Sequence, residues 1–338
     1  GLLDYPNNRK IHSSPLTRLG GISMIFGFCA SFLFLNFINK NLFYLDFNSE
    51  LVDIIILPLI LFFLIGLTDD IFKLSPLTRL ILQLSVSSIA WFNGLRIENI
   101  DISFINNNIQ YLSLPIYLSF LVTIVWISGI TNAINWLDGL DGLATSFSST
   151  ILFSIAIYCF LNGNFTCGIL CILILGTSLG FLPKNKSPAS IYMGDGGSYF
   201  LGFSLATISL ISAFPTTSNT FIIQNLPINF LIPLFFLAVP IIDMLYVICS
   251  RMSEGKSPLY PDNRHIHYRL LRTGINTNTT VIIICIIGFW ISSLTLFFLN
   301  LDNNLLLFIP INIICLLTIK TKINRKSLNF KKSKKIIS

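Results

Sequence analysis

The sequence predicts an all-α, polytopic membrane protein, and three observations support this prediction. Of the 338 residues, 53% are hydrophobic and only 11% are charged, which is far more apolar than a soluble domain of ordinary composition. Apolar runs long enough to cross a bilayer as helices recur along the whole chain. The Lys and Arg residues gather in alternate loops between these runs, as they do in membrane proteins with a fixed orientation.

Ten apolar segments are candidate transmembrane helices, because lipid-exposed backbone must satisfy its hydrogen bonds internally. They lie at about 19–38, 51–68, 77–95, 114–131, 142–161, 165–182, 197–213, 228–249, 279–299 and 304–319. We expect one transmembrane domain over 1–319, followed by a basic cytoplasmic tail over 320–338 beside anionic lipid. The chain begins at Gly1 rather than Met, so a first helix is expected to be missing.

Threading these segments alternately through the membrane assigns each loop to one of two sides. Of the 22 Lys and Arg residues, only Lys40 and Arg96 fall on the second side. The positive-inside rule makes the first side cytoplasmic. Orientation also explains the net charge of +7, so the charge does not indicate nucleic-acid binding. On the second side, loop 96–113 alternates polar and apolar residues around an Asn cluster, which predicts a small extracytoplasmic β-hairpin.

The first cytoplasmic motif is an adjacent acidic pair, Asp69 and Asp70, at the end of the second segment. Ionisable groups at membrane depth are costly and therefore mark functional sites by default. Two neighbouring carboxylates repel each other unless a cation or a proton intervenes. Lys73 follows at a spacing that lets it face either Asp or a phosphate. The alternative is a solvated helix end with a local ion pair.

The second motif is Asn132-Ala-Ile-Asn135-Trp-Leu-Asp138-Gly-Leu-Asp141-Gly, in which four polar side chains recur every three residues. Asn and Asp supply the hard oxygen ligands that suit Mg²⁺. The glycines allow the backbone to approach a ligand closely. The alternative is a turn that uses Asp-Gly chemistry twice.

The third motif, Met193-Gly-Asp195-Gly-Gly-Ser, opens the next segment. A glycine-rich turn before a helix places N–H groups at the positive helix end, where they can cradle a phosphate. Asp195 could then hold a metal that bridges the phosphates. The motif is short, and its weight comes from being the third acidic cluster on the same side.

The fourth motif is the long loop that begins at Arg251, in which two His and two Arg fall within residues 264–269. Such residues suit recognition of anionic oxygens and polar contacts with a sugar. The alternative is a basic loop that only obeys the positive-inside rule. Asp243 lies within the preceding segment, and a buried ion pair or hydrogen bond is its simplest interpretation.

These four strings, in this order, resemble the polyprenyl-phosphate N-acetylhexosamine-1-phosphate transferase family. The opening of the chain, with its Asn, Arg, Lys and His12, resembles the segment after that family's first helix, so the resemblance covers essentially the whole chain. It implies transfer of a sugar 1-phosphate from a UDP-sugar to undecaprenyl phosphate, with release of UMP. The loop has no run of three His, which favours the WecA/TagO-type branch and GlcNAc as the sugar.

The resemblance also implies a metal site and a catalytic group. Asp195 and Asn135 would hold Mg²⁺, with Mn²⁺ as the alternative ion, on the donor diphosphate. Asp69 and Asp70 would act at the acceptor phosphate, as base or as metal support. Asp138 joins the catalytic group without a role of its own. Attack by the lipid phosphate and prior attack by an Asp are both left open.

The remaining matched residues are implied to contact the substrates. Asp141 would meet the uracil and Lys73 a phosphate, while His265 and His267 would act at the sugar end. Asn132, Arg251 and Arg264 complete the substrate-binding set. The family's His-Ile-His-His string ends here in Tyr268, which leaves the role of that position open.

The partners implied are a UDP-sugar and a polyprenyl phosphate in a bacterial cell (inner) membrane, with a cytoplasmic active site. A homodimer stays open as the assembly. The alternatives are the same chemistry on another UDP-N-acetylhexosamine, a non-catalytic lipid-binding relative, and a secondary transporter of an anionic solute. A transporter should place its ionisable groups near mid-membrane in broken helices, whereas here they gather on one side.

Overall fold

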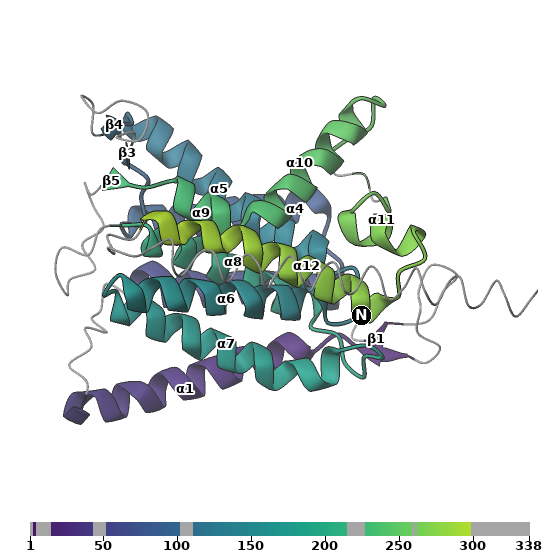
Figure 1. Cartoon of the computed structure of the whole chain (residues 1–338), viewed down its shortest axis with the longest axis horizontal. Helices are drawn as coiled ribbons and strands as arrows, with labels where there is room; N and C mark the ends of the chain where they lie inside the picture. Colours follow the sequence, from purple (N-terminus) through teal and green to yellow (C-terminus); the bar gives the residue numbers. More distant parts are fainter. Residues whose placement is uncertain are drawn as a thin grey trace, which may run out of the picture.

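The computed structural model describes residues 3–4, 15–42, 52–101, 111–214, 227–258, 260 and 262–298. Within these ranges the chain is a helical bundle with two small sheets (Figure 1). The longer helices are α1 (Gly20–Leu42), α3 (Leu57–Phe72), α4 (Pro76–Phe92), α5 (Ile116–Leu137), α6 (Leu143–Leu161), α7 (Phe165–Asn185), α8 (Gly194–Ser212), α10 (Ala238–Met252) and α12 (Thr277–Ser292). Shorter helical elements are η1 (Val52–Ile56), α9 (Leu231–Phe236), α11 (Ile266–Arg272) and η2 (Ser293–Phe298).

The predicted all-α class is confirmed, and the segments expected from 19–38 to 279–299 are all largely helical. In the described part of the chain, 6 helices are long and apolar enough to cross a membrane. The tenth expected segment, 304–319, and the basic tail lie outside the described residues. The expected total of ten spans therefore stays a prediction.

One predicted span is divided in the structure. The segment expected over 228–249 forms two helices, α9 and α10, with a break at Leu237. Pro240 has no N–H to donate to the carbonyl of Phe236, so the ladder of α9 cannot continue through it. As a result, α10 leaves the bundle at an angle and α11 lies beside it (Figure 1).

The predicted hairpin is present as an antiparallel pair, β3 (Asn99–Asp101) and β4 (Tyr111–Ser113). A third strand, β5 (Pro227–Ile228), adds parallel to β3 and was not predicted. This sheet lies at the end of the bundle opposite α11 (Figure 1). A second sheet pairs β1 (Leu3–Asp4) with β2 (Leu16–Thr17).

Helix α8 is the centre of the bundle. Every residue of α8 from Gly196 to Ser212 is buried, as expected for a helix that is apolar or small on all faces. It packs mainly against α3 and α5, and Trp126 of α5 donates its indole N–H to the Ala206 carbonyl at 3.0 Å. Because α8 is enclosed, its N-terminus is fixed beside the ends of α3 and α5.

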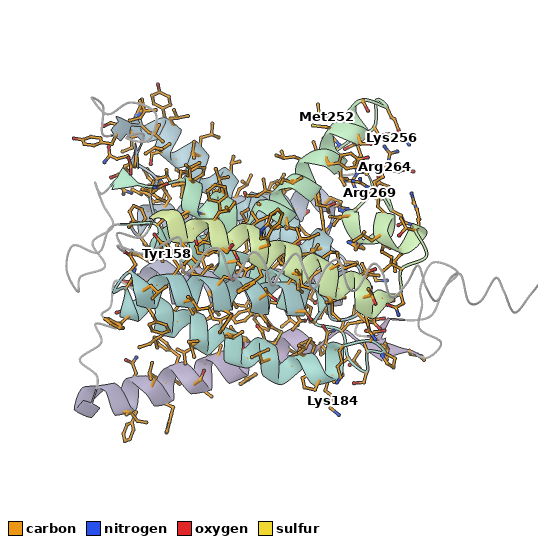
Figure 2. The ribbon with its side chains drawn as sticks, viewed as in Figure 1. Tyr158, Lys184, Met252, Lys256, Arg264 and Arg269 are labelled. Carbon is orange, nitrogen blue, oxygen red and sulfur yellow. The ribbon has the colours of Figure 1, made fainter. Side chains whose placement is uncertain are left out.

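The basic side chains support the two-sided arrangement. Lys184, Lys256, Arg264 and Arg269 all lie toward the end that carries α11, whereas Tyr158 lies toward the other end (Figure 2). The ends of α3 and α5 and the start of α8 are at the α11 end as well. The three acidic motifs therefore meet at the basic end of the bundle.

Candidate active site

The C-terminal end of α3 is joined to the N-terminus of α8 through Asp70. Its Oδ1 accepts the Asp195 N–H and its Oδ2 accepts the Gly196 N–H, both at 3.0 Å. A carboxylate is favoured at this position because free N–H groups and the helix dipole make the N-terminus positive. Gly66 makes the approach sterically feasible, since a Cβ there would collide with the backbone of Asp195.

Asp69 belongs to a second set of contacts, centred on Arg79. One oxygen of Asp69 accepts the Leu74 N–H at 2.7 Å, and the other lies 2.9 Å from Arg79 Nη1. The same guanidinium nitrogen lies 3.7 Å from Asp195 Oδ2. The chain reverses through Lys73, at φ 53°, and α4 starts at an N-cap that Ser75 provides. This turn returns Arg79 to the acidic pair, where it partly neutralises two carboxylates.

Asn135 connects α5 to the same cluster. Its Nδ2 donates to Asp195 Oδ1 at 2.7 Å and to Ser198 Oγ at 2.9 Å. One turn earlier, Asn132 donates to Gln83 Oε1 at 2.6 Å. We call Asp69, Asp70, Asp195, Asn135 and Arg79 together the carboxylate cluster.

A cavity of about 320 Å³ lies beside the carboxylate cluster, between α4, α5 and the loop that joins α10 to α11. It combines aromatic rings with charged and amide groups, as sites for polar organic ligands do. Its lining residues are Pro76, Arg79, Leu80, Asn132, Asn135, Trp136, Gly139, Arg251, Tyr260, Asp262, His265 and Tyr268.

Comparison with known proteins places this site in a family. A family model described as "Glycosyl transferase family 4" matches residues 52–213. The chain is 31% identical over 289 residues to the "Probable undecaprenyl-phosphate N-acetylglucosaminyl 1-phosphate transferase" of Bacillus subtilis. The aligned stretch covers 86% of this chain and 75% of that relative. The chain belongs to glycosyl transferase family 4. The described residues include 6 helices that are long and apolar enough to cross a membrane, so this member of the family is a multi-pass membrane protein.

Two further relatives carry related names. The chain is 30% identical to the "Decaprenyl-phosphate N-acetylglucosaminephosphotransferase" of Mycolicibacterium smegmatis, over 84% of this chain and 72% of the relative. It is 27% identical to the "Undecaprenyl-phosphate alpha-N-acetylglucosaminyl 1-phosphate transferase" of Escherichia coli K12, over 87% of this chain and 76% of the relative. The resemblance inferred from the four strings is confirmed.

The site residues predicted from the sequence fall into two groups: those that line the cavity and those that do not. Asn132, Asn135, Arg251 and His265 line the cavity together. The other predicted residues are not among its lining residues. Asp69 and Asp195 contact the lining residues Arg79 and Asn135, and Asp70 is joined to the backbone of Asp195. Lys73 is exposed at the end of α3.

Two carboxylates of the second motif lie behind the cavity. Asp141 accepts the Ala189 N–H at 3.0 Å and thereby holds the loop between α7 and α8. Asp138 follows the last residue of α5, where burial, together with the charges of Asp70 and Asp141, raises its pKa to about 7. A carboxyl with a pKa near neutrality can both give and take a proton, which suits the catalytic group in which the sequence placed Asp138.

The two histidines of the fourth motif have different surroundings. His265 lines the cavity, and its Nδ1 lies 2.8 Å from Asp243 Oδ2, so the hydrogen bond expected for Asp243 is confirmed. His267 is fully buried against Gly139, and neither of its ring nitrogens has a partner in the described part of the chain. Burial, and then His265, lowers the His267 pKa to about 4. The imidazole of His267 is therefore neutral near pH 7 and packs beside His265, and its role at the sugar end stays a prediction.

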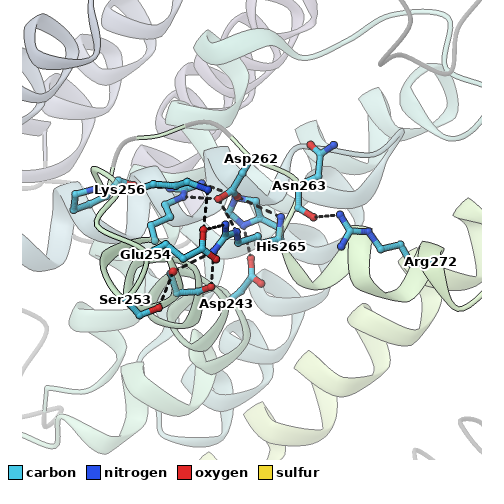
Figure 3. Close-up of polar contacts among 12 residues, drawn as sticks. Asp243, Ser253, Glu254, Lys256, Asp262, Asn263, His265 and Arg272 are labelled. Carbon is cyan, nitrogen blue, oxygen red and sulfur yellow. Dashed lines mark hydrogen bonds and ion pairs between the residues drawn. The ribbon is translucent and has the colours of Figure 1, made fainter.

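The two predicted arginines pair with acidic residues of the α10–α11 loop, Glu254 and Asp262, which are labelled in Figure 3. Arg251 binds Asp262 through Nε and Nη2, at 3.1 and 3.2 Å, and donates Nη1 to the Pro258 carbonyl. Arg264 pairs with Glu254 and Asp262. We call residues 251–264 the arginine loop. Its ion pairs shape one wall of the cavity, since Arg251 also lies 5.1 Å from the Trp136 ring centroid.

Several lining residues were not predicted. Arg79 could have been suspected, since it is a cation near the cytoplasmic start of the segment that follows the Asp pair. Asp262, Trp136 and Tyr260 lie in or beside predicted motifs, but their side chains carried no separate signal. Gln83 lies inside an apolar segment, and its buried contact with Asn132 is visible only in the structure.

Asp195 and Asn135 are the residues expected to hold the metal. They are adjacent and offer oxygen ligands, which Mg²⁺ prefers, and Mg²⁺ usually keeps waters and substrate phosphates as its other ligands. In the described ranges, no group of three or more His, Cys, Asp or Glu side chains is arranged to hold a metal. The residues therefore fit an ion that is held largely by its substrate.

Proposed function

We propose that this protein transfers GlcNAc 1-phosphate from UDP-GlcNAc to a polyprenyl phosphate. An oxygen of the acceptor phosphate attacks the sugar-linked phosphorus of the donor, the bond to the other phosphate breaks, and UMP leaves. The observation that supports this most is the carboxylate cluster beside a polar, aromatic cavity at one end of a membrane bundle. Relatives that cover most of the chain carry names with this activity.

The described residues suggest how two anionic substrates are brought together. The donor lies in the cavity, with its diphosphate toward Asn135 and Asp195. Mg²⁺, when bound there, neutralises the diphosphate and stabilises the leaving phosphate. Arg79 supplies a fixed positive charge between Asp69 and Asp195. Arg79 also lines the cavity, where its guanidinium can contact a substrate phosphate.

The acceptor lipid has an apolar path to this site. A groove of about 370 Å³ runs between α5 and the α9–α10 pair. Its walls are almost entirely hydrophobic, as the isoprene units of a polyprenyl chain require, and they include Val125, Trp126, Ile241 and Met244. The C-terminal part of α5 carries Asn132 and Asn135, so a chain in this groove has its phosphate end near the cavity.

We place the reaction at the cytoplasmic face of a bacterial cell membrane, as the first step of a cell-envelope polysaccharide pathway. The basic end of the bundle holds the cluster, and UDP-sugars are cytoplasmic metabolites. A secondary transporter fits less well, because the carboxylates of the cluster lie at the ends of their helices and not at their middle.

The donor hexosamine is the finer part of the proposal. Tyr268 replaces the fourth family His and lines the cavity, and its ring lies 4.3 Å from that of His267. A phenol is larger and less basic than an imidazole. A different or modified UDP-N-acetylhexosamine is therefore the second candidate donor.

The test is an assay on membranes that contain the full-length protein. Radiolabelled UDP-GlcNAc, undecaprenyl phosphate and Mg²⁺ should give lipid-linked label and UMP, and both should disappear with a chelator and in Asp195→Ala. Glu98→Gln, which alters a carboxylate near the opposite end of the bundle, should be as active as the wild type. Parallel reactions with other UDP-N-acetylhexosamines identify the donor. Folded protein that forms no lipid product with any of them would disprove the proposal.

A further inference from the structure

The junction of α10 and α11 contains a buried acid–imidazole pair, Asp243 and His265 (Figure 3). Asp243 is 7% exposed and His265 6%. One carboxylate oxygen lies 2.8 Å from His265 Nδ1, and the other accepts the Ile266 backbone N–H at 2.7 Å. Both oxygens of Asp243 are therefore committed to the residues that start α11.

Two aromatic rings also pack against the ring of His265. Trp136 packs at 5.7 Å between centroids with an interplanar angle of 61°, and His267 lies parallel at 5.7 Å and 4°. A ring so enclosed has a fixed orientation. Because Nδ1 faces Asp243 and the residue lines the cavity, Nε2 is the nitrogen left for a ligand there.

We infer that Asp243 is a positioning residue that fixes the tautomer of His265 for the donor substrate. A carboxylate can only accept, so Nδ1 must carry the proton. Nε2 of the neutral imidazole is then an acceptor. This inference rests on the proposed function. The matching group on a UDP-hexosamine is a sugar hydroxyl or the N–H of the acetamido group.

The Asp243→Asn variant separates this role from a role in folding. The Ile266 N–H is an obligate donor, so the amide oxygen stays with it. The amide nitrogen then faces His265 Nδ1 and donates to it, which moves the imidazole proton to Nε2. Both contacts that hold α11 are kept, while the cavity-facing nitrogen changes from acceptor to donor.

The experiment compares steady-state kinetics of the full-length wild type, Asp243→Asn, His265→Ala and the double variant, with undecaprenyl phosphate saturating. Asp243→Asn should lower kcat/KM for UDP-GlcNAc by about 10- to 100-fold, as loss of a partner behind an active-site His generally does. Its thermal midpoint should match that of the wild type. The double variant should be no worse than His265→Ala, because Asp243 acts through the imidazole. Glu98→Gln is the matched control for a carboxylate-to-carboxamide change.

A second pair of variants avoids Asp243 altogether. In His265→Gln the side-chain amide reaches the position of Nε2, whereas in His265→Asn it reaches only that of Nδ1. We expect His265→Gln to be the more active of the two. Wild-type kinetics in Asp243→Asn, additive losses in the double variant, or equal activity of the Gln and Asn variants would each overturn the inference and leave the proposed function intact. A wild type that is inactive with every UDP-hexosamine would overturn both.

Discussion

The carboxylate cluster and the arginine loop border the same cavity, yet different contacts hold them in place. In the cluster, Asp70 accepts two backbone N–H groups of α8, and the helices themselves set the geometry. In the loop, Asp262 lies outside any helix and is held by its side-chain ion pair with Arg251, in the last turn of α10. A helix end buried in a bundle permits little movement, whereas a loop held by a few ion pairs can open locally.

This difference separates the two substrate ends. The groups expected near the diphosphate and the metal belong to the rigid part of the molecule. The arginines expected to bind substrate, Arg251 and Arg264, belong to the part that can open locally to admit a donor. Variants in the cluster should therefore abolish the reaction, whereas variants in the loop should mainly weaken donor binding.

The largest effect is expected from Asp70→Ala. The substitution leaves two buried N–H groups at the start of α8 without an acceptor, which should lower the free energy of unfolding by about 2 to 4 kcal/mol. Displacement of Asp195 by even a small distance should reduce turnover at least about a hundredfold. Thermal unfolding in detergent and the lipid-product assay measure the two effects.

Asp69→Ala is the matched variant for that prediction. It removes the partner of Arg79 but leaves the Asp70 contacts with α8. We expect a comparable loss of turnover with a smaller loss of stability. If both variants destabilise equally, Asp70 has no special function at the α8 N-terminus.

The second largest effect is expected from Arg251→Lys. Lysine has a single charged nitrogen and cannot bind Asp262 through two nitrogens while it also reaches Pro258. The KM for UDP-GlcNAc should rise about tenfold, because a buried charge-assisted contact worth roughly 1.5 kcal/mol or more is lost. Trypsin should also cut the arginine loop faster at Lys256.

Arg269→Lys is the control for that substitution. Arg269 is exposed, and its guanidinium lies over the Tyr246 ring at 4.5 Å, a contact that an ammonium can also make. Its kinetics and its cleavage pattern should stay close to those of the wild type. An equal rise of KM in both variants would mean that the effect does not come from the pairing of Arg251 with Asp262.

The sequence predicted the cluster better than the loop for a physical reason. Asp69, Asp70, Asn135 and Asp195 stand at helix ends, and the spacing of apolar segments fixes where those ends lie. The longer-range ion pairs of the loop join residues 10 or 11 positions apart, and they depend on how a segment without a regular repeat folds back on itself, which no spacing encodes. Arg251 was therefore recognised as site chemistry, while its commitment to Asp262 was not.

The division of the predicted span 228–249 has a similar explanation. Its apolar run is continuous, so hydropathy indicates a single helix. The break at Leu237 follows from Pro240 and from the need for α10 to reach α11. The N–H groups of α8 were likewise expected to face a phosphate, which was wrong for two of them, because the sequence does not show that Asp70 accepts them.

A smaller effect is expected from Asp138→Asn. In the unfolded chain this carboxyl has its ordinary pKa of 3.8, and folding raises the pKa to about 7. The folded chain therefore favours the protonated carboxyl. The contribution of this group to the free energy of unfolding is lost as the pH rises through 7, because the buried carboxyl must then ionise. The wild-type thermal midpoint, without substrates or metal, should fall from about pH 5 to about pH 7 and level off above that, because only between the two pKa values does the folded chain bind the extra proton. Asp138→Asn, which mimics the protonated acid, should flatten that slope.

The smallest effect is expected from Lys256→Ala. Lys256 is exposed and pairs at 2.8 Å with Glu254, which is exposed as well. Surface ion pairs contribute little because water and salt screen both charges. Glu254 also keeps its contact with Arg264, so kcat and KM should change less than about twofold. A KM rise as large as that of Arg251→Lys would show that the outer ion pairs of the arginine loop matter as much as the buried one. All the ion pairs of the loop, and not only the Arg251–Asp262 pair, would then hold the cavity wall in place.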